Sequence, residues 1–353
     1  MQKNVKAGIV GFGYMGHFHL NRSKEVDGIE VIAAYDNNLA EKRPEIQASG
    51  LRFCESLNEL LEIPEIDLII VCTPNDSHKD ISIEVLKKEK NVLCEKPAAM
   101  NAKEVKEIIS VANSVGKFYT VHQNRRWDKD YLAVREVLSS NEIGTFHTIN
   151  STAYGQRGVC FGWRADPEHG GGMLYDWGVH LIDQILQMYP EKKLTQIFGR
   201  LESILTPTVD DFFEVKLIFE NGVCANINVG TFALQPYPRW YILGDRGTLM
   251  LNNSDIDGGI SRIKGAVKGF ESVSGSANFE SSRTMAPLSS ENIEVLNLKK
   301  MPDQKYDFYK NLIKAVKGEE KPYVTNEQII RLMTVVDTIF ESSRIGNVLK
   351  VDL

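Results

Sequence analysis

The sequence lacks any apolar run approaching the roughly 18 residues that a membrane-spanning helix needs. The apolar stretch within its first residues, MQKNVKAGIVGFGYMG, is too short for the core of a secretion signal. Basic residues do not cluster beyond the two arginines of NRRW at 124–127, and the formal net charge is −6. These absences predict a cytoplasmic protein that binds neither a membrane nor a nucleic acid.

Cysteine is scarce and shows no CxxC spacing. The five cysteines are odd in number and three of them lie in or beside apolar runs: Cys54, Cys72, Cys94, Cys160 and Cys224. We interpret them as reduced thiols in the core of a cytoplasmic protein. A zinc site would need ligands at closer spacing, so no metal is expected.

The length and composition favour two globular domains. The chain has 353 residues, of which 42% are hydrophobic and 25% charged. We predict a first domain over residues 1–122 and a second over residues 123–353. The last predicted helix, 326–343, is a candidate to pack back on the first domain.

Short, continuous apolar runs alternate with amphipathic segments in the first 120 residues. Residues 79–88 and 102–115 carry apolar side chains at helical spacing. The apolar runs between such segments, which suit strands buried on both faces, are Ala7–Val10, Val31–Ala34, Leu68–Cys72, Val92–Cys94 and Phe118–Val121. This alternation predicts an α/β domain with a doubly wound parallel sheet of the Rossmann type.

After about residue 122 the pattern changes to alternating apolar and polar residues. It is clearest in residues 146–154, 211–230 and 239–251, with hairpin signals at Asn221-Gly222 and Gly244–Gly247. We predict an α+β domain with a large, mostly antiparallel sheet that leaves one face open.

Three helices are expected in this second part of the chain. One, over residues 173–188, interrupts the sheet, and two follow late, over residues 304–317 and 326–343. The last has Thr325 and Gln328 as a capping box and Gly346 just past its end. Residues 252–292 are rich in Ser, Gly and Asn, and we expect strands with long loops there.

The first predicted strand runs directly into GFGYMG, in which Gly11, Gly13 and Gly16 match GxGxxG. The three glycines would allow a tight turn, the approach of a pyrophosphate, and close contact between helix and strand. The diphosphate would lie on the helix N-terminus. The motif therefore predicts dinucleotide binding by this turn, including its other residues Phe12, Tyr14 and Met15.

Asp36 closes the second predicted strand, 20 residues after Gly16. Its carboxylate can accept hydrogen bonds from ribose hydroxyls and would repel a 2′-phosphate. No arginine or lysine follows at once in YDNNLAEKR, so NAD is favoured over NADP. The alternative is that Asp36 only caps the next helix.

Polar residues end the next two predicted strands, at the edge where open α/β sheets bind their ligands. Thr73, Pro74 and Asn75, within VCTPNDSH, should reach the cofactor. His78 either caps the following helix or contacts the ribose. Glu95 and Lys96 end the neighbouring strand, which puts them beside the nicotinamide half.

The chain resembles the Gfo/Idh/MocA oxidoreductases, a family that includes glucose–fructose oxidoreductase and inositol dehydrogenases. The likeness spans essentially the whole chain in consistent order and rests on GFGYMG, CTPNDSH, CEKPAAM, HQNRRWDKDY, GGGMLYDWGVHLIDQ and VTNEQIIRLMTVVDTIFESSRIGNVLKV. HQNRRWD and LYDWGVHLIDQ point toward the branch of scyllo-inositol dehydrogenases. The resemblance also implies a homodimer or homotetramer that forms through the open face of the second sheet.

The resemblance implies that Lys96, Asp176 and His180 are the catalytic residues, with a cis bond after the lysine as in some family members. The residues themselves agree, because Asp176 and His180 are at i and i+4 of a predicted helix and would share a face. There the carboxylate would orient the imidazole as general base. Lys96 would stabilise the negative charge on the reacting oxygen.

Substrate contacts are expected from three further residues. Arg126 could face the substrate by resemblance, or form a salt bridge between the domains. Trp163 and Arg164, in GWRADPEHGGG, could close over a ring of hydroxyls or only shape the loop. Weaker candidates are Gln123, Asn124 and Gln184.

The sequence thus predicts a dehydrogenase or reductase that transfers hydride between NAD and a secondary alcohol or ketone of a cyclic polyol or sugar, similar to inositol. The resemblance leaves two alternatives without net redox change. One is a glycosidase that uses NAD transiently, and the other is a regulator that binds NAD(P).

Overall fold

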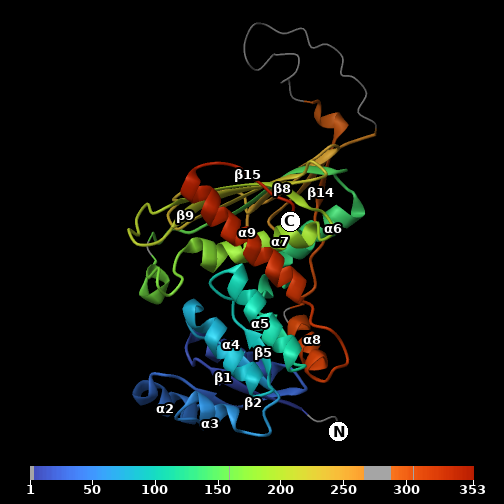
Figure 1. The fold of residues 1–353 in the computed structure, drawn as a ribbon. Coiled ribbons are helices and arrows are strands. Elements are labelled where there is room, and N and C mark those ends of the chain that lie inside the picture. Colours follow the sequence, from blue (N-terminus) through green and yellow to red (C-terminus); the bar gives the residue numbers. More distant parts are fainter. Residues whose placement is uncertain (1–3, 159, 266–287, 305) are drawn as a thin grey trace.

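The computed structural model describes residues 4–158, 160–265, 288–304 and 306–353. Within them, two sheets form separate layers, with the N-terminal sheet at the bottom of Figure 1 and the second sheet at the top. The predicted fold class, a Rossmann-type sheet followed by a mostly antiparallel sheet, is confirmed.

The N-terminal sheet has six parallel strands in the order β3-β2-β1-β4-β5-β6. Every residue of β4, LIIV, is buried, as expected for a strand covered on both faces. The strands are β1 (Val5–Val10), β2 (Ile29–Tyr35), β3 (Arg52–Phe53), β4 (Leu68–Val71), β5 (Asn91–Cys94) and β6 (Tyr119–Val121). The sequence predicted all of these except β3, which is too short and too polar to form an apolar run.

Five α-helices accompany this sheet: α1 (Tyr14–Glu25), α2 (Leu39–Ala48), α3 (Leu57–Leu61), α4 (His78–Lys87) and α5 (Ala102–Ser114). The strand order changes direction between β1 and β4, which leaves a crevice at their carboxyl ends. The glycine turn follows β1 at this edge, and the segments after β4 and β5 end there too.

The second sheet has nine strands in the order β14-β13-β12-β11-β7-β10-β9-β8-β15. All neighbours are antiparallel except β7 and β10, and the predicted hairpins β9–β10 and β11–β12 are present. The strands are β7 (Phe146–Tyr154), β8 (Leu194–Glu202), β9 (Phe212–Phe219), β10 (Cys224–Gly230), β11 (Trp240–Gly244), β12 (Gly247–Leu251), β13 (Gly258–Ile263), β14 (Ile293–Asn297) and β15 (Leu349–Lys350). Of the predicted 252–292 segment, residues 266–287 lie outside the described residues.

Helices α6 (Lys129–Ser140) and α7 (Val179–Met188) lie on the inner side of this sheet, toward the N-terminal layer (Figure 1). The helix predicted over residues 173–188 is not uniform: a π-helical turn, Leu174–Gly178, precedes α7. A π turn shifts the side chains that follow it relative to α-helical spacing. Asp176 therefore does not stand in the ideal i, i+4 relation to His180 that the sequence predicted.

The two C-terminal helices, α8 (Asp307–Val316) and α9 (Asn326–Ile345), connect the layers. On α8, the Tyr309 hydroxyl bonds Nδ1 of His19 in α1 at 2.9 Å. On α9, the Asp337 carboxylate accepts the N–H of Ala102 in α5 at 2.9 Å, and Ile339 packs against Gly199 of β8. The predicted capping box of α9 is present. The boundary at residue 122 stays a prediction.

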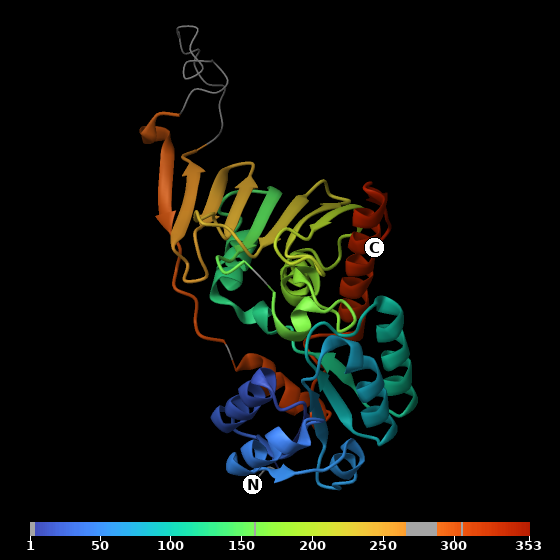
Figure 2. The same cartoon turned by 90° about the vertical axis from the view of Figure 1, so that its left-hand side faces the viewer.

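The outer face of the second sheet has no α-helix over it among the described residues: Figure 1 shows the sheet nearly edge-on, and Figure 2 shows its strands side by side. Its side chains are mixed in character, and the apolar side chains Tyr241 and Met250 are 38% and 39% exposed there. The predicted open face is therefore present. No helix in the described part of the chain is both long and apolar enough to cross a membrane.

Candidate active site

A cavity of about 830 Å³ lies at the carboxyl ends of the N-terminal strands and reaches the loop before α7. Residues from both layers line it. Among the predicted site residues, those that line it are Gly11, Gly13, Tyr14, Met15, Asp36, Thr73, Pro74, Asn75, Glu95, Lys96, Trp163, Arg164, Asp176 and His180. One connected space thus brings together the predicted nucleotide turn, Lys96 about 80 positions later, and Asp176 and His180 more than 150 positions later.

The glycine turn has the geometry that a phosphate cradle requires. Gly11 has φ +89°, and a Cβ there would lie 2.7 Å from the carbonyl oxygen of Cys72. A Cβ on Gly16 would lie 2.5 Å from the carbonyl oxygen of Gly11, whereas Gly13 faces open space. Helix α1 begins at Tyr14 with no side-chain cap, so its first N–H groups are available to an anion.

Two residues of the predicted turn contribute without lining the cavity. Phe12 is fully buried, and Gly16 permits the close approach of α1 to the turn. The Phe12 N–H donates to Oδ2 of Asp36 at 2.7 Å. Gly16 and Phe12 therefore support the conformation of the turn without facing the cavity.

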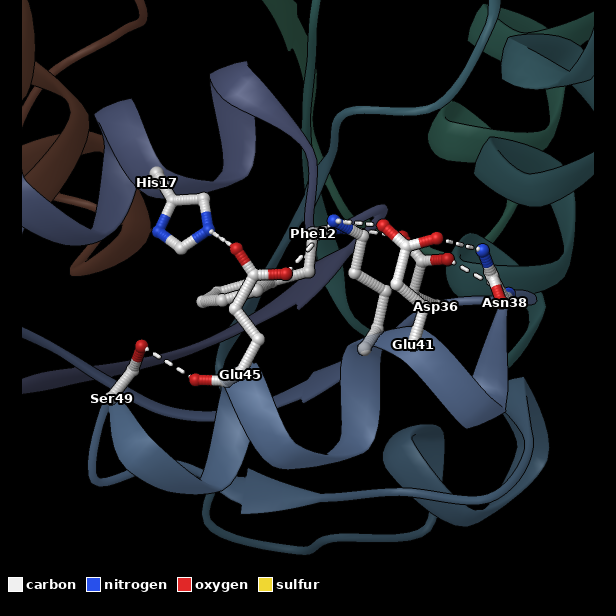
Figure 3. A network of polar contacts seen from close by, with 8 residues as sticks. Phe12, His17, Asp36, Asn38, Glu41, Glu45 and Ser49 are labelled. Carbon is white, nitrogen blue, oxygen red and sulfur yellow. Dashed lines mark hydrogen bonds and ion pairs between the residues drawn. The ribbon is translucent and has the colours of Figure 1, made fainter.

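Asp36 lines the cavity together with its neighbours Tyr35 and Asn37, at the end where the adenosine was predicted. Its Oδ1 accepts the N–H of Asn38 at 2.9 Å, and Figure 3 shows the carboxylate between the Phe12 backbone and Asn38. Because a carboxylate can accept about four hydrogen bonds, these two leave capacity for ribose hydroxyls. The side chain thus bonds the turn before α2, as in the capping alternative, and also lines the cavity.

His78 contacts neither a helix cap nor the cavity. Its Nδ1 lies 2.8 Å from the carbonyl oxygen of Pro97 and its Nε2 lies 2.9 Å from that of Thr73. The ring is fully buried, and burial lowers its pKa. The structure shows no cap by this side chain, and its contact with the ribose stays a prediction. The ring lies between the two loops that follow β4 and β5.

Lys96 and Asp176 form an ion pair between the two layers. The Lys96 Nζ lies 2.7 Å from Oδ1 of Asp176 and 2.7 Å from its carbonyl oxygen. The Lys96–Pro97 peptide is cis. Burial raises the pKa of Asp176, but the charge and hydrogen bond of Lys96, with help from Arg164 at 3.5 Å, hold it below its ordinary value. Asp176 is therefore a carboxylate at neutral pH.

His180 lines the same cavity and is only 5% exposed. Its pKa lies well below the ordinary value because of burial and of the positive charges on Lys96 and Arg125. Its Nδ1 has no hydrogen-bond partner among the described residues. Asp176 does not orient this imidazole as predicted, because after the π turn its carboxylate bonds Lys96 and Arg164 instead.

Glu95 is a buried carboxylate that lines the cavity next to Lys96. Its Oε1 lies 2.8 Å from Nε2 of His19 and 2.7 Å from Nδ1 of His122, and its Oε2 accepts the N–H of Lys96 at 3.2 Å. Burial raises the pKa of Glu95, but the opposite effect of His122 and His19 is larger. The pKa of Glu95 therefore lies well below its ordinary range. The sequence did not single out either histidine, since their partner is distant along the chain.

The atoms that could bind a metal in this cluster are close together. In the described part of the chain, these atoms of His19, Glu95 and His122 lie within 4.8 Å of one another. Each imidazole already bonds the carboxylate, however, and Tyr309 satisfies the second nitrogen of His19. The cluster is thus complete as a hydrogen-bond network that fixes the position of Glu95 and the start of the Lys96 backbone.

The predicted substrate contacts divide into two groups. Trp163 and Arg164 line the cavity, and the Arg164 guanidinium stacks on the Trp163 ring at 4.4 Å. Arg126 does not line it: this buried side chain forms a two-pronged ion pair with Asp183 at 2.7 Å for both contacts. This pair joins segments of the second layer, so it is not the predicted salt bridge between domains.

The weaker candidates divide in the same way. Asn124 lines the cavity, whereas Gln123 and Gln184 do not. Gln184 holds the carbonyl oxygen of Arg125 at 2.7 Å. Arg125 itself lines the cavity but was not predicted, because nothing in NRRW distinguishes its two arginines.

The first layer supplies a parallel sheet, a glycine cradle and a lysine, and the second layer closes the cavity with a carboxylate and a histidine. This is the architecture of a nucleotide-dependent oxidoreductase. Residues 5–123 match the oxidoreductase family with an NAD-binding Rossmann fold, and residues 131–250 match the GFO/IDH/MocA C-terminal domain. The chain belongs to the Gfo/Idh/MocA family of NAD-binding oxidoreductases.

Individual relatives agree with this assignment. An NAD-binding protein from Listeria innocua has 34% sequence identity, with a TM-score of 0.87 over 99% of this chain and 97% of that one. An oxidoreductase from Bacillus cereus shares the fold, with 19% identity and a TM-score of 0.79 over 99% of each chain.

Two curated relatives differ in how much of the chain they match. The scyllo-inositol 2-dehydrogenase (NADP(+)) IolW of Bacillus subtilis is 23% identical over 96% of this chain and 94% of its own length. The uncharacterized oxidoreductase YhhX of Escherichia coli is 31% identical over 59% of this chain and 60% of its own length.

Proposed function

We propose that the protein transfers hydride between NAD and a secondary alcohol or ketone of a cyclic polyol or sugar, similar to inositol. The observation that carries the proposal is the Lys96–Asp176 ion pair in a cavity that His180 and the glycine turn also line. An alcohol at this point would lie within reach of a cationic donor and a neutral imidazole. A relative named as a scyllo-inositol dehydrogenase supports the substrate class.

In the proposed reaction, bound NAD supplies the hydride acceptor for alcohol oxidation. The neutral His180 takes the proton of the substrate hydroxyl, since its lowered pKa keeps it unprotonated at neutral pH. Lys96 donates a hydrogen bond to the same oxygen and stabilises its developing negative charge. Asp176 holds the ammonium of Lys96 in place with two oxygen atoms. In the reverse direction the same groups return the proton to the ketone oxygen.

NAD is the proposed cofactor in preference to NADP. Asp36 puts a carboxylate at the adenosine end of the cavity, and neither Lys nor Arg is among its neighbours Tyr35, Asn37 and Leu57 on that wall. A 2′-phosphate would therefore meet the negative charge of Asp36, and none of these three lining residues carries a positive charge to offset it. Because the relative IolW is named as NADP(+)-dependent, the preference needs its own measurement.

The proposal is tested by following NADH absorbance while the protein and NAD are incubated with a panel of inositols and sugars. Net reduction of NAD with a cyclic polyol or sugar is the expected result. Product formation without net NADH would instead identify an enzyme that uses NAD transiently. Tight NAD binding without any turnover across the panel would favour a regulator and contradict the proposal.

We also propose that subunits pair through the outer face of the nine-stranded sheet to form a homodimer or homotetramer. Exposed Tyr241 and Met250 give this uncovered face an apolar component. Met250→Glu should lower the mass measured by light scattering, whereas Lys103→Glu, an exposed site on α5, should not. An unchanged mass for Met250→Glu would contradict pairing at this point of the sheet.

A further inference from the structure

The end of the cavity that is lined by Lys96, Asp176 and His180 carries more positive than negative charge. Lys96 and Arg164 share the single carboxylate of Asp176, at 2.7 and 3.5 Å. Glu95 also lines the cavity and adds a second negative charge, although its two oxygens are turned to His19, His122 and the Lys96 N–H. Lys96 and Arg164 are therefore balanced by two carboxylates.

Arg125 adds a third cation that is held rigidly. Its guanidinium lies over the Trp177 ring at 4.2 Å, and NH1 bonds Asp128 at 3.0 Å. Gln184 fixes its backbone by donating to its carbonyl oxygen. Arg125 lines the cavity, whereas its negatively charged partner Asp128 does not.

The donors of Arg125 are not all used. Its Nε is buried and has no hydrogen-bond partner among the described residues. An unused buried N–H on a guanidinium is unfavourable unless a ligand satisfies it. A planar fork held by stacking and by an ion pair suits the recognition of a carboxylate or a phosphate.

His169 does not change this balance. It lines the cavity next to Asp76, and its Nδ1 lies 3.1 Å from that carboxylate. The two side chains can neutralise each other across the layers. Near His180 the cavity lining thus holds three cations, Lys96, Arg125 and Arg164, against the two carboxylates of Glu95 and Asp176, which leaves one positive charge in excess.

We infer that the substrate is a hydroxylated ring or chain that bears an anionic group, a carboxylate or a phosphate, bound by Arg125 and Arg164 while Lys96 and His180 act on its hydroxyl. This inference rests on the proposed hydride transfer and narrows its substrate class. With a neutral polyol bound, the two guanidinium groups would keep Asp128 and Asp176 as their partners. An anionic group would in addition balance the remaining positive charge of the cavity lining.

Matched pairs of compounds test the inference. Glucose is compared with glucuronate and with glucose 6-phosphate, and myo-inositol with myo-inositol 1-phosphate, by kcat/KM from NADH absorbance. The anionic member should be preferred by about 10- to 100-fold, the range of a charge-assisted hydrogen bond. The pairs separate a carboxylate from a phosphate. A neutral member that is used equally well or better overturns the inference and leaves the hydride transfer intact.

Arginine variants connect the preference to the residues. Arg125→Gln and Arg164→Gln should each reduce the ratio of kcat/KM for anionic over neutral members, and Arg125→Lys should restore part of it. Arg157→Gln removes an exposed arginine from the same loop as Arg164, outside the cavity lining, and should keep the ratio. Equal losses for both members of a pair would assign the arginines a structural role instead.

A binding measurement separates this inference from the proposed function. If no compound is turned over, the proposed reaction fails for the panel. Titration of the NADH complex with the same pairs still decides the inference, since the anionic members should bind more tightly and lose that advantage as salt is raised. Equal binding of charged and neutral members, or no effect of salt, would refute it.

Discussion

Replacing Lys96 with methionine tests the candidate site most directly, because the change keeps a long side chain and removes its ammonium. The Nζ of Lys96 lies 2.7 Å from two oxygens of Asp176 and lines the cavity with His180. Loss of one donor to a developing oxyanion usually lowers kcat about 10²- to 10³-fold, or about 2.7–4 kcal/mol in the barrier. We expect a loss of that size for Lys96→Met.

The same substitution has a smaller effect on stability. Asp176 keeps Arg164 at 3.5 Å, and its pKa should rise because the lysine no longer opposes the effect of burial. Lys96 and Asp176 are 15% and 22% exposed, so their pair stands between a surface pair and a fully buried one. Losing it should cost about 1–3 kcal/mol in the free energy of unfolding, less than the usual stability of about 5–15 kcal/mol.

Steady-state NADH absorbance gives kcat, and titration of NADH fluorescence gives the affinity for cofactor. Lys96→Met should bind NADH almost as wild type does, because the diphosphate cradle lies at Gly11–Gly16. Lys103→Met, at an exposed site on α5, is the matched control. If Lys96→Met keeps kcat within about threefold of wild type, the role assigned to Lys96 is wrong.

Three further outcomes follow from the cavity. The acid limb of kcat/KM should fall below pH 6.5, because burial and nearby cations hold the pKa of His180 well below that value. Gly16→Ala should abolish NADH binding, since a Cβ would lie 2.5 Å from the carbonyl oxygen of Gly11. Asp36→Ala should shift the NADP/NAD preference toward NADP by about tenfold, since it removes a carboxylate that opposes the 2′-phosphate.

Each of these outcomes has a control. For His180 the sign is fixed, because its pKa is lower in the folded than in the unfolded protein. Its contribution to stability should therefore decline as pH falls from 6.5 toward the folded-state pKa, whereas activity should fall only around that lower pKa. An acid limb above pH 6.5 would contradict this. Gly50→Ala, at a glycine outside the cavity lining with open space around it, should bind NADH normally, although its φ of +81° is unfavourable for alanine. An Asp36→Ala variant with unchanged preference would show that Asp36 serves the turn alone.

Much of the fold could be predicted because its signals are local. The buried strands before Gly11 and Glu95 are continuous apolar runs, and Asn221-Gly222 specifies a hairpin by its backbone preference alone. The glycine turn is also a local signal. At Gly11 and Gly16 an added Cβ would lie within 2.7 Å of a carbonyl oxygen, in agreement with the steric roles predicted for these two residues. The position of Lys96 at the carboxyl edge follows from the parallel sheet.

The remaining features depend on contacts that spacing does not encode. The π turn at Leu174–Gly178 contains no residue that forbids an α-helix, so the apolar pattern predicted a regular one. Arg125 and Arg126 are adjacent and alike, yet one lines the cavity and the other pairs with Asp183. Only the packing of α7 against the segment before α6 decides which side each one takes.

The ion pair between Lys96 and Asp176 connects chemistry to the closure of the cavity. The two residues stand 80 positions apart, on segments that belong to different layers. If the layers separated, both side chains would lose their closest partner and the ion pair would no longer favour the closed arrangement. The contact that aligns Lys96 with His180 is therefore also a contact that holds the cavity wall closed. A substitution at Asp176 should consequently affect both the position of Lys96, the proposed catalytic lysine, and the fit of the second layer on the first.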